Sequence, residues 1–133
     1  MELKDLYALA EAKGVRIMDF SLPENKAVTL KIAENCYIGV DPAVFGRECE
    51  ERIIIAHEMG HIATGGFYTE DTDEEYRKKQ ELKAEKWAME HLVPKTALKN
   101  AIKNGCHSLE SMAEHFCVNE EYMSKVLLYY LDN

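Results

Sequence analysis

The chain has 133 residues, of which 47% are hydrophobic and 30% are charged, a balance typical of one folded domain and not of a disordered chain. It carries 16 Lys and Arg against 24 Asp and Glu, and the net charge of −8 disfavours general affinity for nucleic acid. No apolar run approaches the roughly 20 residues of a membrane span and no signal-peptide pattern opens the sequence, so we expect a cytoplasmic protein with no membrane attachment.

The first part of the chain predicts one helix and then three short strands. Apolar residues recur at helical spacing over residues 2–13, and Gly14 is placed to end that helix. Three segments with strand-like patterns follow, at residues 15–20, 28–32 and 36–40. We expect these strands to form a small antiparallel sheet.

The rest of the chain predicts helices. One runs from Gly46 to about Thr64, where Gly65-Gly66 terminates it. An acidic loop then leads into a second long helix that ends near Leu92. Shorter helices make up a C-terminal segment over about residues 95–133, two of them at 109–116 and 120–131. The predicted fold is a single α+β domain over residues 1–133, with a three-stranded sheet packed on a long helix and further helices at the C-terminus.

The first long helix contains the motif His57-Glu58-Met59-Gly60-His61. Residues four apart share one helical face, so both imidazoles can reach a single zinc ion. Glu58 then lies beside the metal, where it can exchange protons with a metal-activated water. The alternative is a pair of solvent-facing histidines on an ordinary helix. The apolar run that precedes the motif argues against this, because buried histidines are costly without a partner or a metal.

A catalytic zinc site needs a third protein ligand and one open position. Glu81 and Glu85 lie one turn apart on the second long helix. We expect Glu81 to bind the metal, and Glu85 to accept the distal ring N–H of His57 or His61 and so fix its orientation. Without the upstream motif, both glutamates would be expected to pair with lysines on an exposed face.

Two segments of the sequence together resemble the ImmA/IrrE family of metallopeptidases. The first is the histidine motif, and the second reads Glu81-x-x-Ala84-Glu85-x-Trp87-Ala88-x-x-x-Leu92-Val93-Pro94. The resemblance spans roughly residues 3–130 and implies a minimal zincin-like fold with the E-x-x-A glutamate as third zinc ligand. The chain departs from the family pattern at Glu85, where Asn or Asp is usual, and at Trp87, where Phe is usual.

The resemblance also implies an activity and a partner. It predicts a zinc-dependent endopeptidase of phage or mobile-element type, with Glu58 as general base and then general acid. The implied substrate is a helix-turn-helix repressor or an antitoxin. An extended substrate could add to the edge of the third predicted strand, residues 36–40.

Two other functions fit the same sequence. A non-catalytic regulator would use the same zinc ligands and bind a transcription factor without cleaving it. A DNA-binding protein would use the helix-turn-helix-like segment at residues 108–126. Glu120-Glu121 opens the second helix of that segment, where phosphate would lie, so direct nucleic-acid binding is disfavoured.

The remaining reactive side chains receive no role. Tyr68 and His91 are candidates to polarise a scissile carbonyl, but an ordinary surface or boundary position is the better explanation of each. Without a secretion signal, the cysteines are expected to be free thiols, at positions Cys36, Cys49, Cys106 and Cys117.

Overall fold

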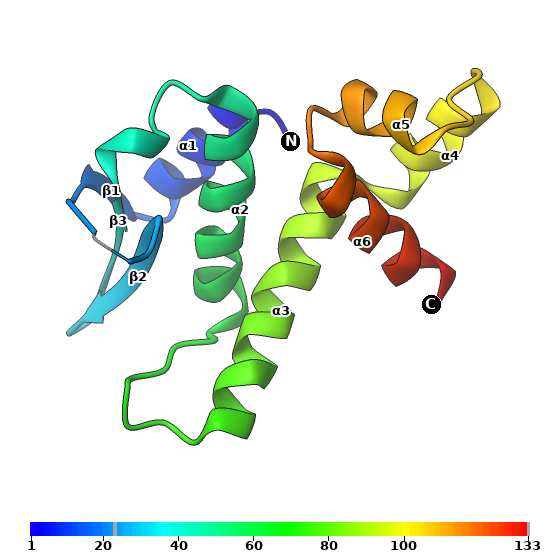
Figure 1. Cartoon of the computed structure of the whole chain (residues 1–133). Coiled ribbons are helices and arrows are strands. Elements are labelled where there is room, and N and C mark those ends of the chain that lie inside the picture. The colour runs from blue at the N-terminus through cyan, green and yellow to red at the C-terminus, as the bar shows by residue number, and fades with distance from the viewer. Residues whose placement is uncertain (23, 133) are drawn as a thin grey trace. The chain divides into compact units, whose positions relative to one another are not determined.

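A computed structural model describes residues 1–22 and 24–132 and confirms the α+β class (Figure 1). The predicted helices and strands all form, with bounds within about two residues of those expected. In chain order the elements are α1 (Leu3–Ala12), β1 (Arg16–Asp19), β2 (Ala27–Ile32), β3 (Asn35–Val40), the 3-10 turn η1 (Pro42–Val44), α2 (Glu48–Thr64), α3 (Glu74–Leu92), α4 (Lys95–Lys103), α5 (Leu109–Phe116) and α6 (Glu120–Leu131).

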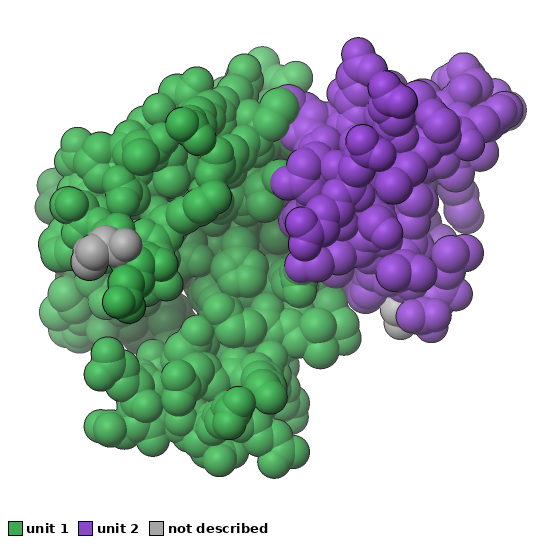
Figure 2. Space-filling model, viewed as in Figure 1, with its two compact units in different colours: residues 1–88 green, residues 89–133 purple. Residues whose placement is uncertain are grey.

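Two compact units divide the chain, Met1–Ala88 and Met89–Asn133 (Figure 2). The first contains the sheet, α1, α2 and most of α3. The second contains the end of α3 together with α4, α5 and α6. The expectation of a single domain over residues 1–133 stays a prediction.

The sheet is mixed, in the order β1-β3-β2. β2 and β3 form an antiparallel hairpin around a two-residue turn, in which Ala33 adopts a positive φ of 57°. β1 instead runs parallel to β3, so the expectation of a wholly antiparallel sheet is wrong for this pair. The reason lies in the connections. A tight turn forces neighbouring strands to be antiparallel, whereas the longer link from β1 to β2 lets the hairpin insert with β3 beside β1.

Because β3 is the central strand, it has no edge to offer an extended peptide. One side of β3 pairs with β1 through Ile17↔Ile38, and the other pairs with β2 through Thr29↔Ile38. The expectation that residues 36–40 bind a substrate by strand addition is therefore wrong. Within the described residues, the outer strands of this sheet are β1 and β2.

Fully buried apolar side chains from three elements form the core of the first unit. Leu6 of α1, Ile38 and Val40 of β3, and Ile55 and Met59 of α2 are all 0% exposed. Helix α1 packs on α2 and β1, while α2 also packs on β2. This packing holds α2 against the sheet and explains why a helix with so many polar residues is largely buried.

Helix α2 ends as its sequence predicts. Gly65 is left-handed, with φ of 67°, and the Gly66 N–H donates to the His61 carbonyl over 2.8 Å. Only glycine adopts this conformation without strain from a Cβ. The chain therefore turns back over the last turn of α2, the turn that carries His61.

In the second unit, α5 and α6 pack against each other. Side-chain caps begin both helices, since Ser108 accepts from the Ser111 N–H and Asn119 accepts from the Tyr122 N–H. None of the helices among the described residues is long and apolar enough to span a membrane.

The cysteines differ from one another. Cys36 and Cys106 are free thiols, as expected. The expectation of a free thiol is wrong for Cys49 and for Cys117, since neither remains a free thiol and each takes part in a disulfide.

Candidate metal centre

His57 and His61 lie one turn apart on the same face of α2. Their rings meet edge to face, with centroids 5.0 Å apart and planes at 81°. The His61 side chain is 7% exposed, while that of His57 is 31% exposed. The pair therefore lies at the boundary between the core and an open surface, where a metal can be both held and reached.

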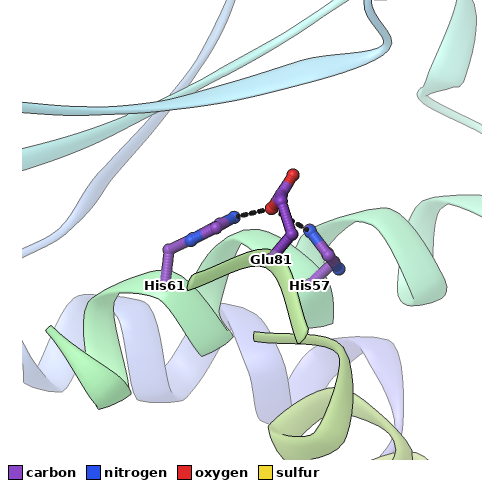
Figure 3. A group of neighbouring side chains, drawn as sticks. All are labelled: His57, His61 and Glu81. Atoms are coloured by element: carbon purple, nitrogen blue, oxygen red, sulfur yellow. Dashed lines mark hydrogen bonds and ion pairs between the residues drawn. The ribbon is translucent and has the colours of Figure 1, made fainter. Parts of the chain in front are cut away.

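Glu81 of α3 completes the cluster (Figure 3). Its Oε2 lies 2.6 Å from His61 Nε2 and 3.1 Å from His57 Nε2. The three side chains offer ligand atoms that all lie within 4.8 Å of one another. Two imidazoles and one carboxylate match the donor set of catalytic zinc sites, which keep one further position open. The structure thus brings together the three residues that the sequence predicts as ligands, in a group that can hold a metal ion.

A glycine allows α3 to come this close to α2. A Cβ added at Gly60 would lie 2.5 Å from the carbonyl oxygen of Ala84 and 3.0 Å from its Cα. Ala84 is 0% exposed, so this contact is in the packed interior. Gly60 lies between the two histidines in sequence, and Ala84 lies one turn after Glu81. The close approach therefore brings the carboxylate of α3 within reach of the imidazoles of α2.

The backbone orients His61. Its Nδ1 lies 2.7 Å from the Gly66 carbonyl oxygen, which can only accept a hydrogen bond. The proton therefore resides on Nδ1, and Nε2 faces Glu81. Burial lowers the pKa of His61, but the hydrogen bonds to Glu81 and Gly66 outweigh burial and raise it overall. Hydrogen bonds with His57 and His61 in turn hold the pKa of Glu81 well below its usual range.

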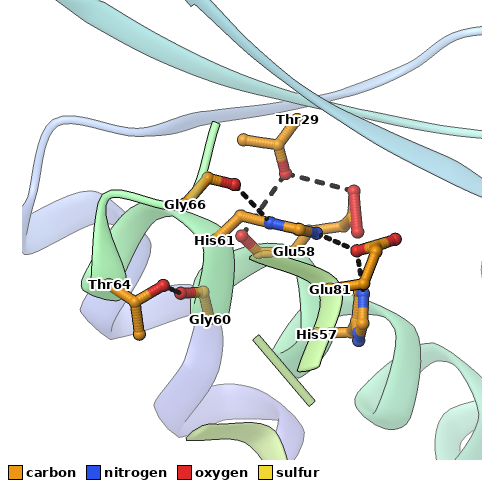
Figure 4. Close-up of polar contacts among 8 residues, drawn as sticks. All are labelled: Thr29, His57, Glu58, Gly60, His61, Thr64, Gly66 and Glu81. Carbon is orange, nitrogen blue, oxygen red and sulfur yellow. Dashed lines mark hydrogen bonds and ion pairs between the residues drawn. The ribbon is translucent and has the colours of Figure 1, made fainter. Parts of the chain in front are cut away.

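Glu58 is buried beside the cluster (Figure 4). It is 7% exposed, and its Oε1 accepts a hydrogen bond from the Thr29 hydroxyl over 3.1 Å. Burial raises the pKa of Glu58, although His57, His61 and the Thr29 hydroxyl each pull it down. A carboxyl group whose pKa is raised by burial is suited to exchange protons near neutral pH.

Glu85 has a less defined place. It lines a cavity of about 570 Å³ together with His57 and Glu81. The distal nitrogen of His61 bonds to the Gly66 carbonyl and not to the Glu85 carboxylate. An orienting contact from Glu85 to His57 stays a prediction.

The site contains residues that the sequence did not single out. Thr29 comes from β2, and Gly66 contributes a main-chain oxygen that no residue type reveals. Tyr68, considered but not assigned, lies on the loop between α2 and α3 with its ring 6.0 Å from that of His61. It lines a second cavity, of about 450 Å³, with Glu58, His61 and Glu81. His91, the other candidate, belongs to the second unit.

Residues 10–127 match the family model described as the IrrE N-terminal-like domain, a peptidase family. No curated protein and no solved structure matches the chain significantly. The matched region spans both long helices and therefore every residue of the histidine and glutamate cluster.

Proposed function

The chain belongs to the IrrE N-terminal-like family of peptidases, and we propose that it is a zinc-dependent endopeptidase that cleaves a regulatory protein. The convergence of His57, His61 and Glu81 next to the buried Glu58 carries this proposal. A metal-binding role alone does not need a carboxylate beside the ligands, whereas hydrolysis does.

The donor set supports zinc as the metal. His57 and His61 would bind it through Nε2 and Glu81 through its carboxylate, because these atoms already face one another. When bound, zinc would supply Lewis acidity and lower the pKa of a coordinated water toward about 7.

Glu58 would carry the proton in both stages of hydrolysis. It would accept a proton from the attacking water as the new C–O bond forms, then give it to the amine as the C–N bond breaks. Burial favours the neutral carboxyl group and so favours the first transfer. Thr29 holds Oε1 throughout and limits rotation of the carboxylate.

The outer strand β2 is the best placed to receive an extended substrate. Four of its residues, Ala27 to Leu30, line the cavity that also contains Glu58, His61 and Glu81. An outer strand presents unpaired main-chain groups, so a peptide can add to it as a further strand. This arrangement would carry a scissile bond past Glu58.

From the family resemblance, the proposed substrate is a helix-turn-helix repressor or an antitoxin, met in the cytoplasm and encoded by a phage or mobile element. A small helix-turn-helix protein encoded by the neighbouring reading frame would be the first to test. Incubation with the zinc-loaded protein and mass spectrometry of the products would give the cleavage site.

The decisive variant is Glu58→Gln. We expect it to retain zinc but to lose about 10²–10⁴-fold in cleavage rate, because the amide cannot accept the proton. Glu48→Gln makes the same chemical change at an exposed position of α2 and should cleave as wild type does. Cleavage by Glu58→Gln at the wild-type rate would contradict the mechanism. A partner that binds tightly but stays intact with the wild-type protein would favour the non-catalytic regulator.

A further inference from the structure

Peptide hydrolysis places negative charge on the carbonyl oxygen, and a hydrogen-bond donor at that oxygen accelerates the reaction. The donor must line the cavity that the substrate enters and must be reachable by it. The cavity of about 450 Å³ beside Glu58 and Glu81 is the place to look for such a donor.

Several donors that line this cavity already make contacts within the structure. The Thr29 hydroxyl donates to Glu58. The Thr69 hydroxyl lies 3.3 Å from that of Thr72, and Nη2 of Arg77 donates to the carbonyls of Glu70 and Thr72 over 3.4 and 3.2 Å. Nε of Arg77 is buried, so a substrate cannot reach it.

Tyr68 differs from these donors. Its ring packs edge to face on His61, with centroids 6.0 Å apart and planes at 72°, and it lines the cavity together with Glu58 and Glu81. The residue is 37% exposed, so a substrate can contact it. Its donor is therefore both at the metal cluster and open to the cavity.

The loop that carries Tyr68 is fastened to α3 by Arg77. The guanidinium carbon lies 5.9 Å from the centre of the Tyr68 ring, and the same group holds two loop carbonyls. A donor that is fixed before the substrate arrives has little reorganisation cost in the transition state. Arg77 is thus a positioning residue for Tyr68.

We propose that Tyr68 is a catalytic residue, whose phenol donates a hydrogen bond to the scissile carbonyl oxygen as that oxygen becomes negative. The proton stays on the phenol throughout, and Glu58 carries the transferred proton. This inference rests on the proposed peptidase function and adds the residue that stabilises its transition state.

The test compares Tyr68→Phe with Tyr76→Phe. Tyr76 is 49% exposed on α3 and lines neither cavity described above, so its variant loses the same hydroxyl away from the site. On the protein cleaved in the Glu58 experiment, we expect Tyr68→Phe to lose about 10²–10³-fold in kcat, with KM and zinc affinity unchanged. Tyr76→Phe should match wild type.

A second measurement does not depend on turnover. A short peptide in which a tetrahedral phosphinate replaces one amide mimics the charged transition state, and calorimetry gives its affinity for the zinc-loaded protein. We expect Tyr68→Phe to weaken this binding by a factor similar to its loss in kcat/KM.

Three results would overturn the proposal: an unchanged kcat, an unchanged phosphinate affinity, or a loss of activity matched by an equal loss of zinc affinity, which would make Tyr68 a support for Glu81. If the wild-type protein cleaves no partner, the proposed function fails instead, and phosphinate binding still tests Tyr68.

Discussion

At the scale of single residues, the carboxyl group of Glu58 is subject to opposing influences. Burial disfavours its charge, while the two histidines and the Thr29 hydroxyl favour it. Burial dominates, so the pKa in the fold is higher than in the unfolded chain. The ionised side chain therefore lowers the stability of the metal-free protein.

This difference in pKa predicts how stability depends on pH. A raised pKa gives a contribution that is complete below the unfolded value of about 4.3 and is lost as pH rises through the folded value. Glu58→Gln cannot ionise and does not suffer this loss. In EDTA, we expect the variant to gain stability over wild type between about pH 4 and pH 7.

Urea unfolding of both metal-free proteins at the two pH values would measure this gain. Glu48→Gln, which alters an exposed carboxyl group on the same helix, serves as the control and should show no such trend. A difference between Glu58→Gln and wild type that stays constant with pH would show that burial does not govern this carboxyl group.

At the scale of elements, the contact between α2 and α3 depends on the missing side chain of Gly60. Helix propensity alone predicts that Gly60→Ala stabilises the protein by about 1 kcal/mol. The added Cβ would however lie 2.5 Å from a main-chain oxygen of α3, which cannot rotate away. We expect the clash to dominate and to destabilise the protein by about 1–3 kcal/mol.

Thermal unfolding with and without zinc would test this expectation. Because a separation of the two helices also moves Glu81 away from the histidines, zinc affinity should fall together with stability. A Gly60→Ala protein that is more stable than wild type and binds zinc equally well would contradict the close approach.

The loop between α2 and α3 provides a second prediction at this scale. Removing the guanidinium in Arg77→Ala frees the carbonyls of Glu70 and Thr72. We expect the amides of Thr69 and Thr72, which are hydrogen-bonded within the loop, to exchange with solvent about tenfold faster, as the loss of roughly 1.4 kcal/mol implies.

Hydrogen exchange read by NMR would report these two amides. Lys78→Ala alters the next residue of α3, whose exposed side chain pairs only with Glu74 among the contacts described, and should leave them unchanged. Equal protection in Arg77→Ala would mean that the loop is held by its own turn and not by α3.

The sequence predicted the site best where metal-ligating residue types lie at helical spacing. His57, His61 and Glu81 could be predicted because a helix fixes the direction of residues four apart and because zinc restricts the ligand types. Thr29 could not be predicted, because the alternation of apolar and polar residues in β2 suggests that the apolar side chains face the core. Leu30 and Ile32 are 44% and 59% exposed, while the polar Thr29 bonds to Glu58 of α2.

The order of the strands and the contacts made by main-chain atoms could not be predicted from the sequence, for a different reason. Three strand-like segments are compatible with several orders, and only the unequal lengths of their connections separate the mixed sheet from an antiparallel one. Nothing in the residue types pointed to the Gly66 carbonyl oxygen as the partner of His61 Nδ1.

At the scale of the whole molecule, a metal bound by side chains of the two successive helices α2 and α3 should stabilise the folded state. At free zinc of 100 times Kd the gain is about 2.7 kcal/mol. For a chain of this size we expect Tm to rise by roughly 10 °C. EDTA should reverse the rise.

Scanning calorimetry with a histidine variant would assign this gain to the cluster. His57→Ala should lose the zinc-dependent rise, whereas His115→Ala, in the second unit, should keep it whatever its own Tm. An equal rise in both variants would place the zinc elsewhere.

The bond from His61 Nδ1 to the Gly66 carbonyl has a consequence for how this centre can vary among descendants or designs. A ligand oriented by a neighbouring carboxylate can be retuned by one amino-acid exchange, but an oxygen of the peptide backbone is present whatever residue occupies the position. The backbone path after α2 therefore determines which ring nitrogen of His61 carries the proton. Insertions or deletions in that short segment, rather than substitutions, are the changes that would alter it.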